Sequence, residues 1–143
     1  MWLFATDGTL VPLVLRLTLA IVIFPHGAQK VLGWFGGHGL RGTLGFFGSQ
    51  GIPLPLALLA IAAEFLGSIG LAVGLLTRVA AFGIACVMVV AVLTVHAKVG
   101  FFMNWFGTQK GEGFEFHLLA IGIAVALIIG GAGRWSLDAL IAP

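Results

Sequence analysis

Apolar residues along the chain gather into four long stretches, separated by polar and glycine-rich segments. The stretches run over Leu10–Lys30, Leu54–Leu76, Val79–Lys98 and Phe114–Gly131. Each has roughly 18 to 23 residues, and a helix of about 20 apolar residues crosses a hydrocarbon core about 30 Å thick. Only Thr77 and Arg78 separate the second stretch from the third, which predicts an antiparallel hairpin. The pattern therefore predicts an all-α membrane protein, an antiparallel bundle of four transmembrane helices in a single domain over residues 1–143.

Two connections between the stretches combine glycine with aromatic residues and differ from ordinary polar loops. The first covers residues 33–51 and the second residues 100–113, and both contain Trp and Phe between glycines. Aromatic rings are favoured at the membrane–water interface, so we expect both segments to lie there. Both fall on the same side of a four-helix bundle, called the connection side below. We predict that they pack on each other as a lid over polar groups. The alternative is an interfacial belt that covers nothing.

The composition narrows the class of protein further. Hydrophobic residues make up 60% of the chain and charged residues only 8%, whereas a soluble domain carries about 25% charged residues. The net charge of +2 comes from cations that flank the stretches, which indicates contacts with lipid headgroups and not with nucleic acid. Cys86 is the one cysteine, which excludes an internal disulfide and the CxxC redox and zinc patterns.

Most polar residues of the stretches fall near the connection side. In an antiparallel bundle, the ends of the first and third stretches meet the starts of the second and fourth. Near that surface this order places His26, Gln29, Lys30, His96, Lys98, Glu115 and His117. Helical phase predicts that Glu115 faces the bundle interior together with Gly122 and Ala126. The same phase turns His117 by about 200° toward the headgroups.

Two charged residues lie well inside the stretches, where a charge costs about 2.5 to 3.5 kcal/mol. Glu64 is near the middle of the second stretch and Arg16 is inside the first. We expect Glu64 to face the interior and to contact a polar group of the first stretch, either Arg16 or the region of His26. Arg16 has a second candidate partner, Asp138, and an Arg16–Asp138 pair would be a structural ion pair on the opposite side. The sequence leaves this choice open.

The order of several short motifs resembles the DoxX family of membrane proteins. The motifs are Arg16, FPHG at 24–27, QK at 29–30, GWFGG at 33–37, AEFLG at 63–67, GLLTR at 74–78, Met88, His96, GFF at 100–102, Glu115 and GAGRWSLD at 131–138. This resemblance implies a multi-pass protein of the bacterial inner (plasma) membrane with four helices. The family is named for a subunit of a thiosulfate:quinone oxidoreductase, and most of its members have no defined activity. Many members are regarded as membrane partners in redox or stress responses.

The first functional hypothesis is a redox-linked membrane subunit that binds a quinone, or a similar apolar ligand, on the connection side. A quinone needs a hydrogen-bond donor at each carbonyl, a proton path and an apolar slot. Candidate residues for hydrogen bonds and protons are His26, Gln29, Lys30, Glu64, His96 and Glu115, and candidate walls for the ring are Trp34, Phe101 and Phe102. Quinone is the candidate cofactor, and the sequence assigns no catalytic set.

Other functions stay open beside the quinone hypothesis. One is a non-enzymatic membrane partner or assembly factor for another protein, so whether the chain is an enzyme is undecided. Another is a haem or metal site with His26 and His96 as ligands, because bis-histidine ligation between helices of a bundle is feasible. A proton-coupled transporter is disfavoured by the lack of paired repeats.

We expect contacts with the lipid bilayer and with a protein partner or a second copy. Lysine and arginine on the connection side predict that it faces the cytoplasm.

Overall fold

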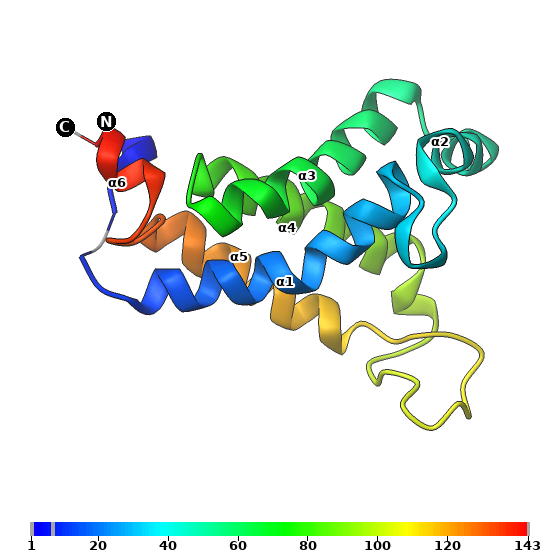
Figure 1. The fold of residues 1–143 in the computed structure, drawn as a ribbon. Helices are drawn as coiled ribbons and strands as arrows, with labels where there is room; N and C mark the ends of the chain where they lie inside the picture. Colours follow the sequence, from blue (N-terminus) through cyan, green and yellow to red (C-terminus); the bar gives the residue numbers. More distant parts are fainter. Residues whose placement is uncertain (1, 7, 143) are drawn as a thin grey trace.

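The computed structural model describes residues 2–6 and 8–142, and its elements are helices joined by loops. No β-strand occurs among these residues, which confirms the predicted all-α class. The long helices are α1 (Val11–Val31), α3 (Leu54–Val73), α4 (Thr77–Thr94) and α5 (Glu115–Gly130). The short ones are α2 (Gly39–Ser49), α6 (Leu137–Ile141) and the 3-10 helices η1 (Trp2–Phe4), η2 (Trp34–Gly36) and η3 (His96–Lys98) (Figure 1).

The four long helices correspond to the four predicted stretches. Within the described residues, α1, α3 and α4 are long and apolar enough to cross a membrane, with 21, 20 and 18 residues. Helix α5 is apolar but has 16 residues, about 24 Å at 1.5 Å per residue. It is therefore shorter than an average hydrocarbon core of about 30 Å. The chain is a multi-pass membrane protein with three long apolar helices and a shorter fourth.

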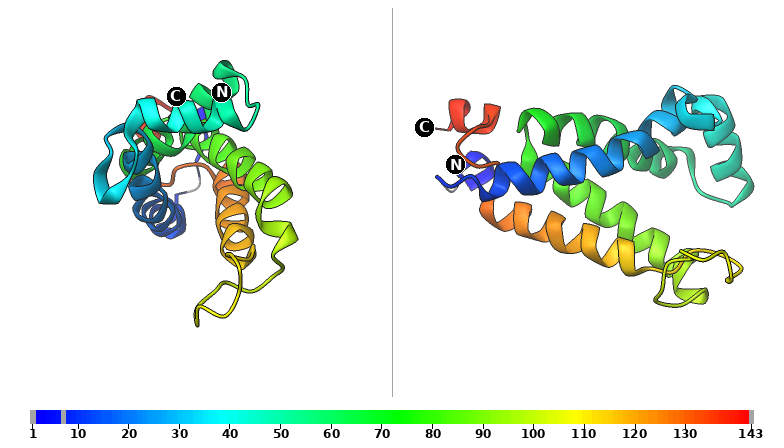
Figure 2. Two further views of the ribbon diagram at one scale, coloured as in Figure 1. Left: turned by 90° about the vertical axis from the view of Figure 1, so that its right-hand side faces the viewer. Right: turned by 60° about the horizontal axis from the view of Figure 1, so that its bottom comes forward.

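The long helices pack side by side as a bundle (Figure 2). Helix α3 packs against both α1 and α4, helix α4 also packs against α5, and α5 contacts α1. The largest apolar side chains buried between the helices are Leu19, Ile23, Leu71, Ile84 and Leu127. Many other large apolar side chains point outward and are exposed, among them Leu59, Leu66, Phe82, Leu119 and Ile129. Lipid tails can cover such faces without cost, so the outer surface of the bundle contacts the bilayer.

Both aromatic connections lie at one end of the bundle, and α6 and both termini lie at the other end, called the terminal side below (Figure 1). This arrangement confirms that the two connections share a side. The first connection contains helix α2, which has 11 residues, where the sequence predicted only an interfacial segment. A helix within this connection is therefore a feature that sequence reasoning missed.

The predicted lid is wrong, because the two connections do not pack on each other. In all three views α2 and the loop 99–114 lie on opposite sides of the bundle (Figures 1 and 2). Each connection is held by its own neighbouring helix instead. The hydroxyl of Thr43 in α2 donates to the carbonyl of Lys30, while the backbone amide of Met103 donates to the carboxylate of Glu115. The rings of the connections are consequently exposed, with Trp105 at 78%.

On the terminal side, Arg16 and Arg78 are buried and bind the backbone carbonyls of helix ends. The acceptors of Arg16 are the carbonyls of Leu71, Ala72, Ala132 and Trp135, and the acceptors of Arg78 are those of Ala5, Ile128 and Ile129. The last carbonyls of a helix have no intrahelical donor, and hydrocarbon offers no water to replace one. The two arginines therefore satisfy the C-terminal ends of α3 and α5.

Asp138 satisfies the N-terminal end of α4 in the same region. Its carboxylate accepts hydrogen bonds from the backbone amides of Leu76 and Thr77, at 2.7 and 2.9 Å. A negative charge is stabilised at a helix N-terminus. The predicted Arg16–Asp138 ion pair is wrong, since the ion pair found among the described residues is Lys30–Glu64. Arg16 and Asp138 instead form hydrogen bonds with backbone carbonyls and amides at helix ends. A search of the sequence for opposite charges does not find such partners.

Helices α1 and α3 approach closely at Gly27. A Cβ atom built at Gly27 would lie 2.6 Å from the Cα of Phe65. The Gly27→Ala variant should therefore push the helices apart and lower the free energy of unfolding by about 1 to 3 kcal/mol. Gly122→Ala is the matched control, because nothing lies within 4 Å of its added methyl group and alanine favours a helix by about 1 kcal/mol. Detergent-denaturation curves followed by circular dichroism measure both, and equal stabilities would contradict the close approach.

Candidate functional site

An ion pair joins α1 and α3 near the connection side. The side chain of Glu64 is only 5% exposed, and its carboxylate binds the ammonium of Lys30 in the last turn of α1. The expectation that Glu64 faces the interior and contacts a polar group near His26 is confirmed. The partner is Lys30, one turn beyond His26, and Arg16 is not involved. Pairing stabilises a carboxylate at a depth where lipid would otherwise penalise it.

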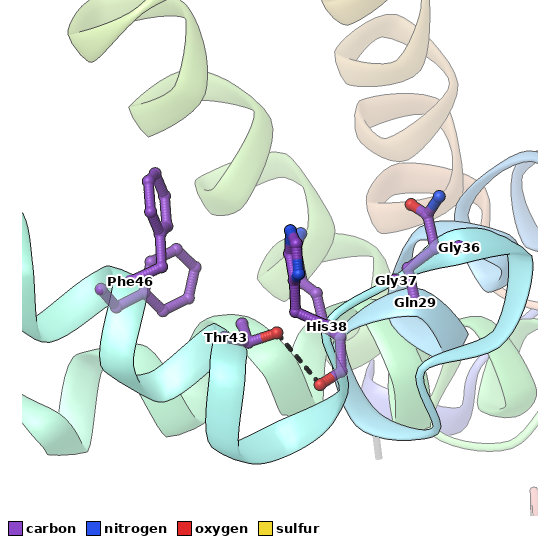
Figure 3. A pocket seen from close by; sticks show the side chains of 8 residues that line it. Gln29, Gly36, Gly37, His38, Thr43 and Phe46 are labelled. Carbon is purple, nitrogen blue, oxygen red and sulfur yellow. Dashed lines mark hydrogen bonds between the residues drawn. The ribbon is translucent and has the colours of Figure 1, made fainter.

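A pocket of about 270 Å³ lies beside Lys30, between the end of α1, the η2 turn and α2. Its lining residues are Gln29, Lys30, Gly36, Gly37, His38, Thr43, Phe46 and Phe47. In Figure 3 the ring of Phe46, the imidazole of His38 and the amide of Gln29 rise on the same side of this segment. Ligand pockets have volumes of about 300 to 1,000 Å³, so this pocket suits a single small ring with polar substituents.

Local contacts hold η2 and α2 against the end of α1. Gly37 packs on the backbone of Gln29 so closely that a Cβ atom has no room there. The side-chain amide of Gln29 donates to the carbonyl of Phe35 at 3.2 Å. The hydroxyl of Thr43 donates to the carbonyl of Lys30 at 3.2 Å, which is the dashed line in Figure 3. These contacts fix the walls of the pocket relative to Lys30.

A second group of polar residues lies where η3 meets α5. The ring centroids of His96 and His117 are 4.0 Å apart, and those of His26 and Phe116 are 6.5 Å apart. Nδ1 of His96 lies 2.8 Å from the carbonyl of Glu112. Because a carbonyl only accepts, this nitrogen carries a hydrogen, and Nε2 is the acceptor of a neutral His96. Nδ1 of His117 is buried and has no hydrogen-bond partner among the described residues.

Helix α5 is rotated relative to the prediction. Its buried residues are His117, Ala120, Ala124 and Leu127, which recur at helical spacing. Gly122 and Ala126, which were predicted to face the interior, are exposed. Glu115 turns toward the loop, where its carboxylate accepts hydrogen bonds from the amide of Met103 and the indole of Trp105, at 3.0 and 3.1 Å. The prediction failed because it placed the smallest residues inside and ignored the loop amides that an acidic residue in the first turn can bind.

The predicted ligand-binding residues are distributed over three places. Gln29 and Lys30 line the pocket, with Glu64 bound to Lys30. His26, His96 and Glu115 belong to the polar group around η3 and α5. Trp34, Phe101 and Phe102 lie on the aromatic connections and are exposed. The structure thus divides the single site that the sequence predicted into a pocket, a histidine group and two exposed aromatic surfaces.

Six residues that line the pocket were absent from the predicted site, namely Gly36, Gly37, His38, Thr43, Phe46 and Phe47. A signal for them exists in the sequence. The helical spacing of three and four residues between Thr43, Phe46 and Phe47 places their side chains on one face of a helix. This helix is hard to recognise in the sequence because it contains glycines at positions 42, 45 and 48. Glycine disfavours a helix by about 1 kcal/mol relative to alanine.

The rings of His26 and His96, the candidate haem or metal ligands, contact other side chains and not each other. The described residues contain no group of three His, Cys, Asp or Glu side chains that could hold a metal ion. His26 is exposed, and its ring lies near Phe116. His96 is instead bonded to the carbonyl of Glu112 and lies against His117.

Comparison with known protein families finds one match. The sequence profile of the DoxX family matches residues 11–97, which is more than half of the chain. The matched region begins with α1 and ends within η3, so it includes Lys30, Glu64 and every residue that lines the pocket. Helix α5 and His117 lie beyond it. No curated protein and no solved structure matches the chain.

Proposed function

The chain belongs to the DoxX family, and on that premise we propose that it is a redox-linked membrane subunit that binds a quinone, or a similar apolar carbonyl compound. The observation that supports this proposal is the pocket beside Lys30. Its volume of about 270 Å³ is lined by Phe46, Phe47, His38 and Lys30 among others, and the ammonium of Lys30 binds the carboxylate of Glu64 beside it. A mostly apolar slot with a few polar groups is typical of a site for a small ring.

Each wall of the pocket has a role in this proposal. The rings of Phe46 and Phe47 pack on the faces of the ligand ring. The ammonium of Lys30 and the imidazole of His38 donate hydrogen bonds to its carbonyl oxygens. Glu64 keeps Lys30 charged and oriented, so that the ammonium stabilises the negative charge that develops on an oxygen as electrons arrive.

Reduction of a quinone to a quinol consumes two electrons and two protons. In this proposal the electrons come from the redox centre of a partner protein, and the chain supplies the binding site and the charged groups around it. In this proposal Lys30 donates one proton to one reduced oxygen and His38 donates the second proton to the other, after which both groups are reprotonated from water at the membrane surface. The side chain of Lys30 is 29% exposed, which gives such water access to it.

Titration of the purified protein in nanodiscs with a short-chain quinone tests this function. We expect saturable binding that the Phe46→Ala and His38→Ala variants weaken about tenfold, the equivalent of about 1.4 kcal/mol for a lost ring contact or hydrogen bond. Phe106→Ala is the matched control, because Phe106 is 90% exposed on the other aromatic connection and should not change the affinity. Absence of saturable binding to the wild type, or equal affinities of the Phe46→Ala and Phe106→Ala variants, would rule out this pocket.

A non-enzymatic membrane partner or assembly factor is the second candidate function. Gly122, Ala126 and Gly130 form a stripe of small residues on α5, and nothing lies within 4 Å of a Cβ atom added at either glycine. Small residues spaced by four allow a neighbouring transmembrane helix to approach closely. Native mass spectrometry from the membrane separates the candidates. An associated subunit or second copy favours the partner role, while a single chain with a bound apolar molecule favours the ligand site.

We place the protein in the bacterial inner membrane with its connection side in the cytoplasm. The family membership motivates the location, and the distribution of cations motivates the orientation. Lys30, Arg41, Lys98 and Lys110 belong to the connection side. The terminal side has Arg16 and Arg78, both buried against backbone carbonyls, and the exposed Arg134, so four of the seven lysines and arginines lie on the connection side. Cytoplasmic loops of membrane proteins carry an excess of Lys and Arg.

A further inference from the structure

The loop 99–114 is internally bonded and presents aromatic rings at its tip. The side chains of Asn104 and Gln109 hold the turn, since Nδ2 of Asn104 donates to the carbonyl of Gln109 and the amide of Gln109 donates to Oδ1 of Asn104. The carboxylate of Glu112 accepts a hydrogen bond from the amide of Asn104 at 2.7 Å. Trp105 and Phe106 are 78% and 90% exposed. The tip of the loop is therefore an internally bonded unit that carries both rings.

Three side-chain hydrogen bonds attach this unit to the helices, and one of them runs from the backbone amide of Met103 to the carboxylate of Glu115 at 3.0 Å. On the α4 side, Nδ1 of His96 donates to the carbonyl of Glu112 at 2.8 Å. On the α5 side, the carboxylate of Glu115 accepts a hydrogen bond from the indole of Trp105 at 3.1 Å. A displacement of His96 would move Glu112 through the hydrogen bond between them. Because the loop is internally bonded, it would also strain the hydrogen bond between Trp105 and Glu115.

The ring of His96 also contacts His117, and this contact depends on charge. Imidazole is the side chain whose charge ordinarily changes between about pH 5 and pH 8. Two protonated rings with centroids 4.0 Å apart repel each other, and burial of His117 limits the screening of that repulsion by water. His117 is fixed within α5, whereas His96 lies on the short η3, beyond the last residue of α4. The ring of His96 is therefore the one that moves.

We propose that the His96–His117 pair is an acid-sensitive latch of the aromatic loop. With at most one ring protonated, the rings stay in contact and the loop stays attached. With both protonated, His96 moves away from α5, the tip of the loop around Glu112 follows, and Trp105 separates from Glu115, while backbone hydrogen bonds between residues 113–115 and 100–102 hold the base of the loop. The other ionisable groups around the pair are Glu112 of the loop, Glu115 of α5, Lys98 of η3 and His26 of α1. This latch is independent of any ligand in the pocket.

Fluorescence of Trp105 as a function of pH tests the latch. In a variant that keeps Trp105 and has phenylalanine at the other three tryptophans, we expect acrylamide quenching in nanodiscs to rise at the acidic end of the range, as the pH falls toward about 5, because burial and the neighbouring imidazoles oppose the second proton. The His117→Gln and His96→Asn variants should lose this rise. His38→Asn is the matched control, because His38 lies on the other connection, and it should keep the full response.

Two results would overturn the latch. One is unchanged quenching of Trp105 across the whole pH range in the protein with both histidines. The other is a response that persists in the His96→Asn variant and disappears in Glu115→Gln, which would assign the change to the carboxylate. The His117→Gln variant changes a buried side chain and can fail to fold. His96 is only half-buried, so the His96→Asn variant should fold and still tests the latch.

Discussion

The Arg16→Met variant is expected to lose about 3 to 5 kcal/mol of unfolding free energy, because each buried acceptor left without a donor costs about 1 to 3 kcal/mol. The side chain of Arg16 is buried and donates to carbonyls in the last turn of α3 and in the segment before α6. Methionine fills a similar apolar volume but donates no hydrogen bond. Unfolding in detergent, followed by circular dichroism, measures the loss.

Two further arginine variants separate hydrogen bonding from charge. Arg134→Met removes an exposed arginine from the same side of the bundle and should change the stability by less than about 0.5 kcal/mol. Arg16→Lys keeps the charge, but one ammonium cannot reach acceptors that a planar guanidinium bridges, so most of the loss should remain. Wild-type stability of Arg16→Lys would show that charge alone matters. Equal stabilities of Arg16→Met and Arg134→Met would contradict the proposed role of Arg16.

The sequence was sufficient to predict the four long helices and the end of the bundle at which Lys30, His96 and Glu115 lie. Lipid requires a spanning segment to satisfy its own backbone, so long apolar stretches become helices whatever their neighbours are. The order of the stretches then places Lys30, His96 and Glu115 on one side without any knowledge of packing. Helix α2 was not predicted because its four glycines weaken the local helix signal.

Rotation of the helices about their axes was harder to predict. An outward face in lipid is as apolar as an inward one, so hydrophobic periodicity does not distinguish them. Helix α5 illustrates this, because His117 is buried while Gly122 is exposed, the reverse of the prediction. Glu64 was an exception, since a carboxylate in mid-span must find a partner in the bundle. Which partner it finds depends on the depth and reach of Lys30, and those follow only from the packing of α1 on α3.

The predicted lid and the predicted Arg16–Asp138 pair failed for a common reason. Both predictions paired features that share a side of the membrane, and neither counted the unsatisfied backbone groups nearby. Arg16 and Asp138 bind carbonyls and amides of helix ends, and Glu115 binds an amide of its own loop. In hydrocarbon each such group is expensive to leave unpaired. When the partner of a polar side chain close to a helix end is predicted, unpaired backbone groups should therefore be considered before opposite charges.

The Lys30→Met variant should be less stable than Glu64→Gln, although both break the same ion pair. Removal of Lys30 leaves the buried carboxylate of Glu64 without a partner, and loss of one member of a buried pair costs about 3 to 5 kcal/mol. Removal of the Glu64 charge leaves a lysine that is 29% exposed. That lysine can turn its ammonium toward the headgroups, so the cost should be about 1 kcal/mol. Chemical unfolding of both variants in the same detergent measures this asymmetry.

The double variant Lys30→Met/Glu64→Gln completes the test of the ion pair. If the pair interacts directly, the double variant should recover part of the stability that Lys30→Met loses, with a coupling energy of about 1 to 3 kcal/mol. Lys98→Met on the same side is the control, because Lys98 is exposed and in no ion pair that the structure describes; it should not couple to Glu64→Gln. Strictly additive losses in the double variant would mean that Lys30 and Glu64 act separately. Glu64 would then need another partner, and Lys30 would be free to face the pocket with an ammonium that no carboxylate orients.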